Sequence, residues 1–249
     1  MKKIILPALL ALAFTSASAA EKTAEAPHWS YQGHAGASHW GDLQSDFATC
    51  KLGTEQSPID IRGAVNADLP ALGFQYVPSK AEVVNNGHTI QVNLAAGSTV
   101  KLASGDYQLL QWHVHTPSEE KVNGKAYPLV AHLVHKNADG KLAVVAVLFK
   151  QGKSNPVLAK VFAAMPAKAD QKAELAEDFN PADLLPAKQG YYAFKGSLTT
   201  PPCSEGVQWQ VLKQPVEMSA AQLKTFRKLY PMNARPVQPL NGRTLQQSQ

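Results

Sequence analysis

The stretch Gln111-Trp112-His113-Val114-His115 indicates both the kind of fold and the kind of site in this chain. It is aromatic and β-branched with alternating character, which predicts a strand. Side chains two residues apart on a strand point to the same face. His113 and His115 can therefore reach one point together from a rigid sheet.

A third histidine, His132, joins the pair if the chain turns back at Asn123-Gly124, the strongest short hairpin signal. With those two residues as the turn, Val122 faces Lys125. Counting outward places His132 opposite His115. Three histidines with an open fourth position are the usual ligands of a catalytic zinc ion.

Two prolines leave an alternative open. Pro117 and Pro128 lie inside the expected hairpin, and proline interrupts a strand ladder. A bulge could shift the pairing by one residue and turn His132 to the other face. His113 and His115 would then be two half-exposed strand histidines. In the expected register, Val134 shares the face of His132 and lies opposite His113.

Length and composition suit an ordinary globular protein. The chain has 249 residues, of which 45% are hydrophobic and 17% charged, and it carries no low-complexity tract or internal repeat. No linker rich in Gly, Pro or Ser marks a boundary. We expect a single domain over residues 21–249, with the ordered fold beginning near residue 25.

Residues 1–20 have the pattern of a secretory signal peptide. Lys2-Lys3 is a basic start, and residues 4–14 form a short apolar run. Both Ala17-Ser18-Ala19 and Ser18-Ala19-Ala20 fit the cleavage rule. The apolar run is too short to span a bilayer, and no later run approaches that length. We therefore expect an exported protein without a membrane span, in the periplasm for a bacterial-type signal.

Charge and cysteine count narrow the function further. The formal net charge is +5, of which Lys2 and Lys3 leave with the signal peptide. The remaining lysines form no basic stripe, so we expect no nucleic-acid partner. Two cysteines, Cys50 and Cys203, favour one disulfide in an exported protein. Two zinc thiolates are the alternative, although the pair lacks metal-site spacing.

The remaining chain is rich in strands. The run at residues 142–149 is apolar throughout and predicts a strand buried on both faces. Asn155 and Ser219 can each cap a short amphipathic helix. The fold class is therefore mainly β with short peripheral helices. Strands are expected at residues 80–94 (two, around Asn86-Gly87), 99–102, 107–115, 129–135, 142–150 and 207–212.

Other side chains could complete a site around the histidines. Glu119 has the same parity as His115 and could be a ligand, a base or an orienting acceptor. Val134 and Val144 could form an apolar wall for a small nonpolar substrate. The loop at residues 198–203 carries Thr199 between stiff prolines, and His88 follows a turn. The alternatives are an ordinary loop threonine and a solvent-exposed turn histidine.

An ordered set of motifs resembles the α-class carbonic anhydrases, in particular the exported bacterial type. Each motif alone is weak, but together they follow the family's order from Trp29 to Arg243. They are residues 56–61 (QSPIDI), 85–88 (NNGH), 111–115 (QWHVH), 118–119 (SE), 131–135 (AHLVH), 196–203 (GSLTTPPC), 207–211 (VQWQV) and 233–240 (NARPVQPL).

The resemblance implies a large twisted, mostly antiparallel central sheet and reversible hydration of carbon dioxide to bicarbonate and a proton. It assigns Zn²⁺ to His113, His115 and His132, with attack on carbon dioxide by zinc-bound hydroxide. Glu119 and Thr199 resemble the pair that orients this hydroxide, and His88 resembles the proton shuttle.

The resemblance also assigns supporting residues. It implies a Cys50–Cys203 disulfide, cis bonds at Ser57-Pro58 and Pro201-Pro202, and a possible homodimer. The carbon dioxide pocket would be formed by Val134, Val144, Leu198, Thr199, Thr200, Val207 and Trp209. The supporting and water-ordering residues would be Tyr31, Asn86, Gln91, Gln111 and Asn233.

Two positions depart from the family pattern. Val130 stands where the family usually has a glutamate that holds the ring of the third histidine, and valine cannot accept its N–H. Loss of the glutamate at position 130 costs about 10–100-fold in metal affinity or activity, unless a water or another group takes its place. Glu120 stands where many members have histidine or asparagine, which could alter the network behind Glu119. We expect an active enzyme with weaker zinc retention.

The sequence is compatible with three kinds of function. The first is the zinc-dependent lyase. The second is a related binding module without activity. Such modules generally lack one of the three ligand histidines, whereas this chain keeps all three. The third is a structural zinc protein, which needs a fourth protein ligand.

Overall fold

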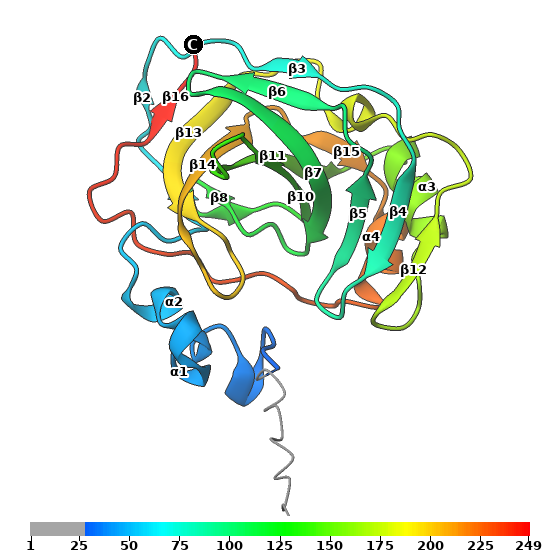
Figure 1. Cartoon of the computed structure of the whole chain (residues 1–249), viewed down its shortest axis with the longest axis horizontal. Coiled ribbons are helices and arrows are strands. Elements are labelled where there is room, and N and C mark those ends of the chain that lie inside the picture. Colours follow the sequence, from blue (N-terminus) through cyan, green and yellow to red (C-terminus); the bar gives the residue numbers. More distant parts are fainter. Residues whose placement is uncertain (1–27) are drawn as a thin grey trace, which may run out of the picture.

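A single sheet of 13 strands runs through the part of the chain that the structure, a computed structural model, describes, residues 28–249 (Figure 1). The signal peptide expected at residues 1–20 lies outside these described residues. Three neighbouring pairs of strands are parallel and the others antiparallel, which confirms the expected fold class. The main path runs β12 (Gln171–Glu174), β4 (Ala81–Asn85), β5 (Ile90–Leu94), β7 (Gly105–His115), β10 (Leu129–Lys136), β11 (Leu142–Gln151), β14 (Glu205–Leu212), β13 (Tyr191–Ser197), β16 (Gln246–Gln247) and β2 (Val65–Asn66).

Shorter strands extend this sheet at its sides. β6 (Thr99–Leu102) joins β7 to β3 (Gly73–Gln75), and β15 (Val216–Met218) pairs with β11. A separate sheet of three strands consists of β1 (Asp60–Ile61), β8 (Lys121–Val122) and β9 (Lys125–Ala126).

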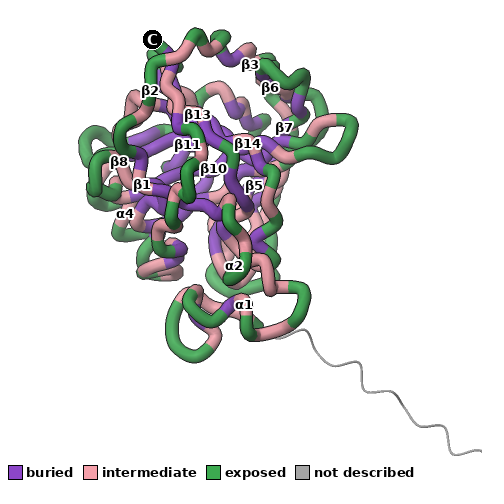
Figure 2. Tube along the Cα trace, turned by 90° about the vertical axis from the view of Figure 1, so that its left-hand side faces the viewer, coloured by how far each residue is buried: buried purple, intermediate pink, exposed green. Residues whose placement is uncertain are grey.

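The middle of the sheet is buried on both faces, as expected for residues 142–149. Val145, Val147 and Phe149 of β11 belong to one hydrophobic core, and Val144 and Ala146 belong to another on the opposite face. Because strand side chains alternate, one apolar run fills both cores. In Figure 2 the buried segments accordingly gather along β10, β11 and β14.

The helices are short and lie outside the sheet. α3 (Pro156–Ala163) begins after Asn155, whose side chain accepts hydrogen bonds from two helical N–H groups, and α4 (Ala220–Arg227) begins with a capping box at Ser219. Both caps were expected. The other helical turns are η1 (Gly33–Ala35), α1 (Trp40–Leu43), η2 (Ser45–Phe47), α2 (Thr49–Leu52) and η3 (Pro181–Leu184).

The expected hairpin turn exists, but its register does not extend to the histidines. Val122 pairs with Lys125 around Asn123-Gly124, as expected. Those strands belong to the small sheet, where β8 also pairs with β1. The turn therefore does not determine how β7 and β10 pair in the large sheet.

The pairing between β7 and β10 corrects the sequence prediction. His132 lies opposite His113, not opposite His115, and Val130 lies opposite His115. Val134 faces Gln111 instead of His113. The shift is two residues, so it preserves the face on which every side chain lies.

Further covalent features agree with the resemblance. Cys50 and Cys203 form a disulfide. The bonds Ser57-Pro58 and Pro201-Pro202 are cis, and Thr116-Pro117 is a third cis bond that the sequence did not predict. Among the described residues, no helix is long and apolar enough to cross a membrane.

Candidate metal centre

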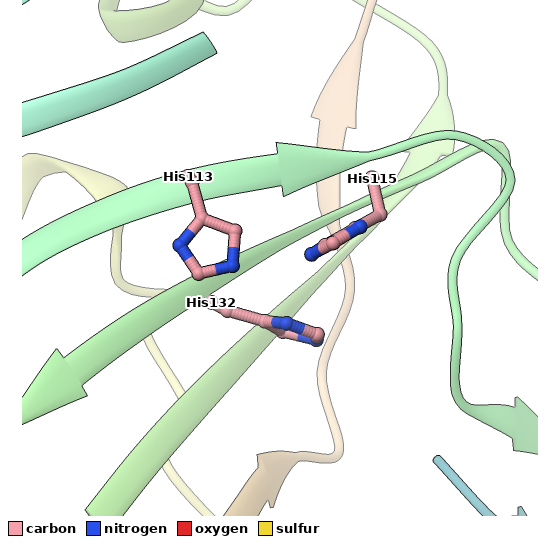
Figure 3. A group of neighbouring side chains, drawn as sticks. All are labelled: His113, His115 and His132. Atoms are coloured by element: carbon pink, nitrogen blue, oxygen red, sulfur yellow. The ribbon is translucent and has the colours of Figure 1, made fainter. Parts of the chain in front are cut away.

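Three histidines converge from two neighbouring strands. His113 and His115 project from β7 toward His132 on β10 (Figure 3). Their candidate ligand nitrogens all lie within 4.8 Å of one another. Within residues 28–249 this is the group of His, Cys, Asp and Glu side chains arranged to hold a metal ion.

Hydrogen bonds fix the first two imidazoles. His113 Nδ1 lies 2.8 Å from Gln111 Oε1, and His115 Nδ1 lies 2.7 Å from the backbone oxygen of Asn233. Each Nδ1–H donates to its oxygen, which leaves Nε2 free to face the centre. Burial lowers the pKa of His113 to about 3, and it lowers that of His115 well below its usual value.

The third imidazole is held by Glu120. His132 Nε2 lies 3.0 Å and 3.2 Å from the two carboxylate oxygens of Glu120, so Nδ1 faces the centre. Although burial opposes it, Glu120 raises the pKa of His132 above its usual value. Val130, at the position where the family usually has glutamate, lies fully buried beside apolar side chains.

This arrangement fits a zinc ion. Each imidazole has one nitrogen bound to an oxygen acceptor and the other turned inward. The inward Nε2 of His115 is buried without a hydrogen-bond partner, which a metal bond would resolve. Three neutral imidazole donors are the ligands of an open catalytic zinc site, whereas a structural site needs a fourth protein ligand.

A buried carboxyl lies just behind the histidines. Glu119 Oε1 accepts a hydrogen bond of 2.8 Å from the backbone N–H of Arg235, while Oε2 lies 3.5 Å from His115 Nε2. Burial raises the pKa of Glu119 to about 7, against the lowering effects of His132, Arg235 and the Thr199 hydroxyl. Oε2 itself makes no hydrogen bond of normal geometry with the protein.

A cavity of about 230 Å³ opens beside the metal centre. One side is apolar and the other polar. Val207 is not in its lining: it is buried in the apolar core that also contains Val134, Val144 and Trp209. The lining includes the other expected pocket residues Val134, Val144, Leu198, Thr199, Thr200 and Trp209, together with Tyr31, Asn86, His88, Gln91 and Gln111.

His88 reaches this cavity from the turn between β4 and β5. Its backbone N–H donates to the Asn86 side chain at 3.0 Å, which holds the turn. Burial and the nearby His28 lower the pKa of His88 below its usual value. It is thus partly buried at the cavity, and not a fully exposed turn residue.

Sequence reasoning did not assign three further residues at the site. Trp29 and Thr89 line the cavity, and Arg235 supports Glu119 through its backbone. Trp29 lies 59 positions before His88 in the chain but packs against it, a contact without a local signal. Arg235 belongs to the motif at residues 233–240, which marked the segment but not this contact.

Taken together, an open three-histidine centre on a mostly antiparallel sheet defines a zinc metalloenzyme. Residues 35–249 match the family model described as eukaryotic-type carbonic anhydrase. The chain is 44% identical over 244 residues to a carbonic anhydrase of Pectobacterium carotovorum, covering 98% of each chain. It therefore belongs to the α-class carbonic anhydrase family and is a carbonic anhydrase that uses zinc.

Solved structures agree with this assignment. An alpha-carbonic anhydrase from Thermovibrio ammonificans, in complex with the inhibitor sulfanilamide, matches with a TM-score of 0.86 at 48% identity, over 89% of this chain and 99% of that chain. The Photobacterium profundum alpha-carbonic anhydrase matches with a TM-score of 0.84 at 49% identity, over 88% and 100% of the two chains.

Proposed function

We propose that this chain hydrates carbon dioxide inside the 230 Å³ cavity and passes the released proton outward through His88. The observation that carries the proposal is the convergence of three inward-facing imidazole nitrogens within 4.8 Å, next to an apolar wall. His113, His115 and His132 would hold zinc, which activates a water molecule by lowering its pKa to about 7.

Thr199 and Glu119 orient the attacking oxygen. Glu119 is fixed by the Arg235 N–H and has one oxygen free of normal hydrogen bonds, so it can accept a hydrogen bond from the Thr199 hydroxyl. The Thr199 hydroxyl oxygen can then only accept a hydrogen bond from the activated water. A fixed acceptor of this kind aims the lone pair that attacks carbon.

The apolar side of the cavity holds the substrate. Val134, Val144, Leu198 and Trp209 offer no hydrogen bonds, which suits a small nonpolar molecule such as carbon dioxide. The Thr199 backbone N–H and the Thr200 hydroxyl would meet the charge that develops on bicarbonate. Val207 packs in the same apolar core as these wall residues.

His88 accepts the proton and delivers it to buffer. An imidazole titrates in the range that this step requires, and the polar side of the cavity joins it to the metal centre. Tyr31, Asn86 and Gln91 line that side and would order the connecting waters.

The signal-like pattern at residues 1–20 and the Cys50–Cys203 disulfide support export, and we propose the periplasm as the compartment. A homodimer stays a prediction, which light scattering of the purified chain would check.

Stopped-flow hydration of carbon dioxide tests the proposed function. We expect one zinc per chain, activity that is lost on chelation and returns with added zinc, and no activity in His115→Ala. Full activity of the metal-free chain would overturn the proposal. Zinc binding without hydration would instead favour the binding or structural alternatives.

A further inference from the structure

Position 130 lacks the glutamate that the family usually has there, but another residue, Glu120, places a carboxylate next to His132. The carboxylate oxygens of Glu120 lie 3.0 Å and 3.2 Å from Nε2 of His132. Both side chains are buried: Glu120 is 0% and His132 1% exposed. The N–H that a carboxylate at position 130 would receive is therefore already taken.

His132 is the only described hydrogen-bond partner of the Glu120 carboxylate in residues 28–249. A buried carboxylate is costly unless it is paired. The contact with His132 compensates that cost and fixes the ring so that Nδ1 faces the metal centre. A carboxylate behind a metal-binding imidazole also makes that imidazole a stronger donor.

The backbone around Glu120 is fixed from both sides. The Ser118 hydroxyl donates to the Glu120 carbonyl at 2.7 Å and accepts from the Tyr127 N–H at 2.8 Å. On the other side, the Lys121 N–H donates to the Ile59 carbonyl at 3.2 Å, where β8 meets β1. A carboxylate on a segment this constrained can hold the His132 ring in one orientation, as a preorganised set of metal ligands requires.

The surroundings of Val130 suit an apolar side chain and not a second carboxylate. Val130 lies two residues before His132 on β10, so both side chains share one face. There it is 0% exposed within the apolar cluster that includes Ile59 and Leu148. A second carboxylate at this position would compete for a single N–H and would lie unpaired in an apolar environment.

We propose that Glu120 is the positioning residue for the third zinc ligand, His132, and that Val130 and Glu120 form a coupled pair. This inference rests on the proposed zinc site. It makes zinc retention depend on Glu120, and it replaces the expectation of weak retention caused by Val130.

The test measures zinc affinity and not only turnover. In the full chain, competition with a chelator of known affinity should give a Kd about 10–100-fold higher for Glu120→Ala than for the unchanged protein. Glu120→Gln should lose less, because its amide oxygen can still accept the N–H. Glu174→Ala, which removes an exposed glutamate on β12, should leave the Kd unchanged.

Relocation of the carboxylate separates a positioning role from a structural one. Adding Val130→Glu to Glu120→Ala should restore most of the lost affinity, because residue 130 shares the face of His132. Val130→Glu alone should not tighten zinc binding. An unchanged Kd in folded Glu120→Ala would overturn the inference. If the alanine variant does not fold, an unchanged Kd in Glu120→Leu, which keeps a similar volume but has no acceptor, would overturn it equally.

The two proposals fail in different ways. If the unchanged protein binds no zinc or hydrates no carbon dioxide, the proposed function fails. If it binds one zinc and is active, but the Glu120 variants retain zinc equally well, only the present inference fails.

Discussion

The imidazole of His88 lies flat against the indole of Trp29, with ring centroids 3.6 Å apart and planes inclined by 6°. His28 meets the same imidazole edge-on, with ring centroids 5.4 Å apart. One face of the shuttle candidate is thus covered by an aromatic ring, while His88 still lines the cavity. This stacking holds a partly buried ring between the metal centre and solvent.

His88→Ala should slow steady-state hydration in weak buffer by at least about 10-fold, because proton transfer out of the cavity loses its acceptor. Added imidazole should restore much of the rate, and zinc content should not change. Stopped-flow measurements across a buffer series check this. A variant as fast as the unchanged protein in weak buffer would contradict the shuttle role.

His28→Ala should change the pH dependence of that step. Burial first, and then the like charge of His28, lower the pKa of His88, while Asp170 raises it. Removal of His28 should therefore raise the pKa of His88 toward its usual value. Since the shuttle must be neutral to accept a proton, the weak-buffer rate profile should move to higher pH.

The matched control for this shift is His34→Ala, which removes another exposed histidine that does not act on His88. Its profile should coincide with that of the unchanged protein. A His28→Ala profile that stays in place, or moves to lower pH, would exclude the electrostatic coupling.

The sequence predicted the site better than it predicted the pairing that builds it. Parity alone fixes the face on which a strand side chain lies, so His113, His115 and His132 could be grouped correctly. Their register could not, because the Asn123-Gly124 turn pairs β8 with β9 in a separate sheet. The error of two residues left the face unchanged.

Contacts between separate segments of the chain could not be predicted from the sequence. Glu120 and His132 are brought together by the loop after β7 and the middle of β10, and no local pattern specifies such a contact. The strand β13 (Tyr191–Ser197) was not predicted either. Its residues include Lys195 and Gly196, and its burial does not alternate regularly.

The disulfide should supply a large part of the stability. Cys50 and Cys203 are separated by 153 positions, and closing a loop of this length stabilises a fold by about 5 kcal/mol on the chain-entropy model. The double variant Cys50→Ser, Cys203→Ser should lose free energy of unfolding of that order in urea titrations. Reduction of the unchanged protein should give the same loss. A loss below about 1 kcal/mol would show that the bridge is dispensable.

The apolar wall of the cavity makes a steric prediction. Val144 on β11 lies 2% exposed and lines the cavity together with Val134 and Trp209. Val144→Phe should fill the space proposed for carbon dioxide and lower kcat/KM by at least about 10-fold, which corresponds to 1.4 kcal/mol in the barrier. Zinc content should stay at one per chain, because the phenyl group would occupy the substrate space and leave the three histidines in place.

Val144→Ala is the matched control, since it enlarges the same wall without blocking it. We expect this variant to keep kcat/KM within a few-fold of the unchanged protein, at a cost in stability from the lost methyl groups. Equal activity of the phenylalanine and alanine variants would mean that the substrate does not bind against Val144. In that case carbon dioxide would have to approach the metal centre from the polar side, past Thr200 and Gln91.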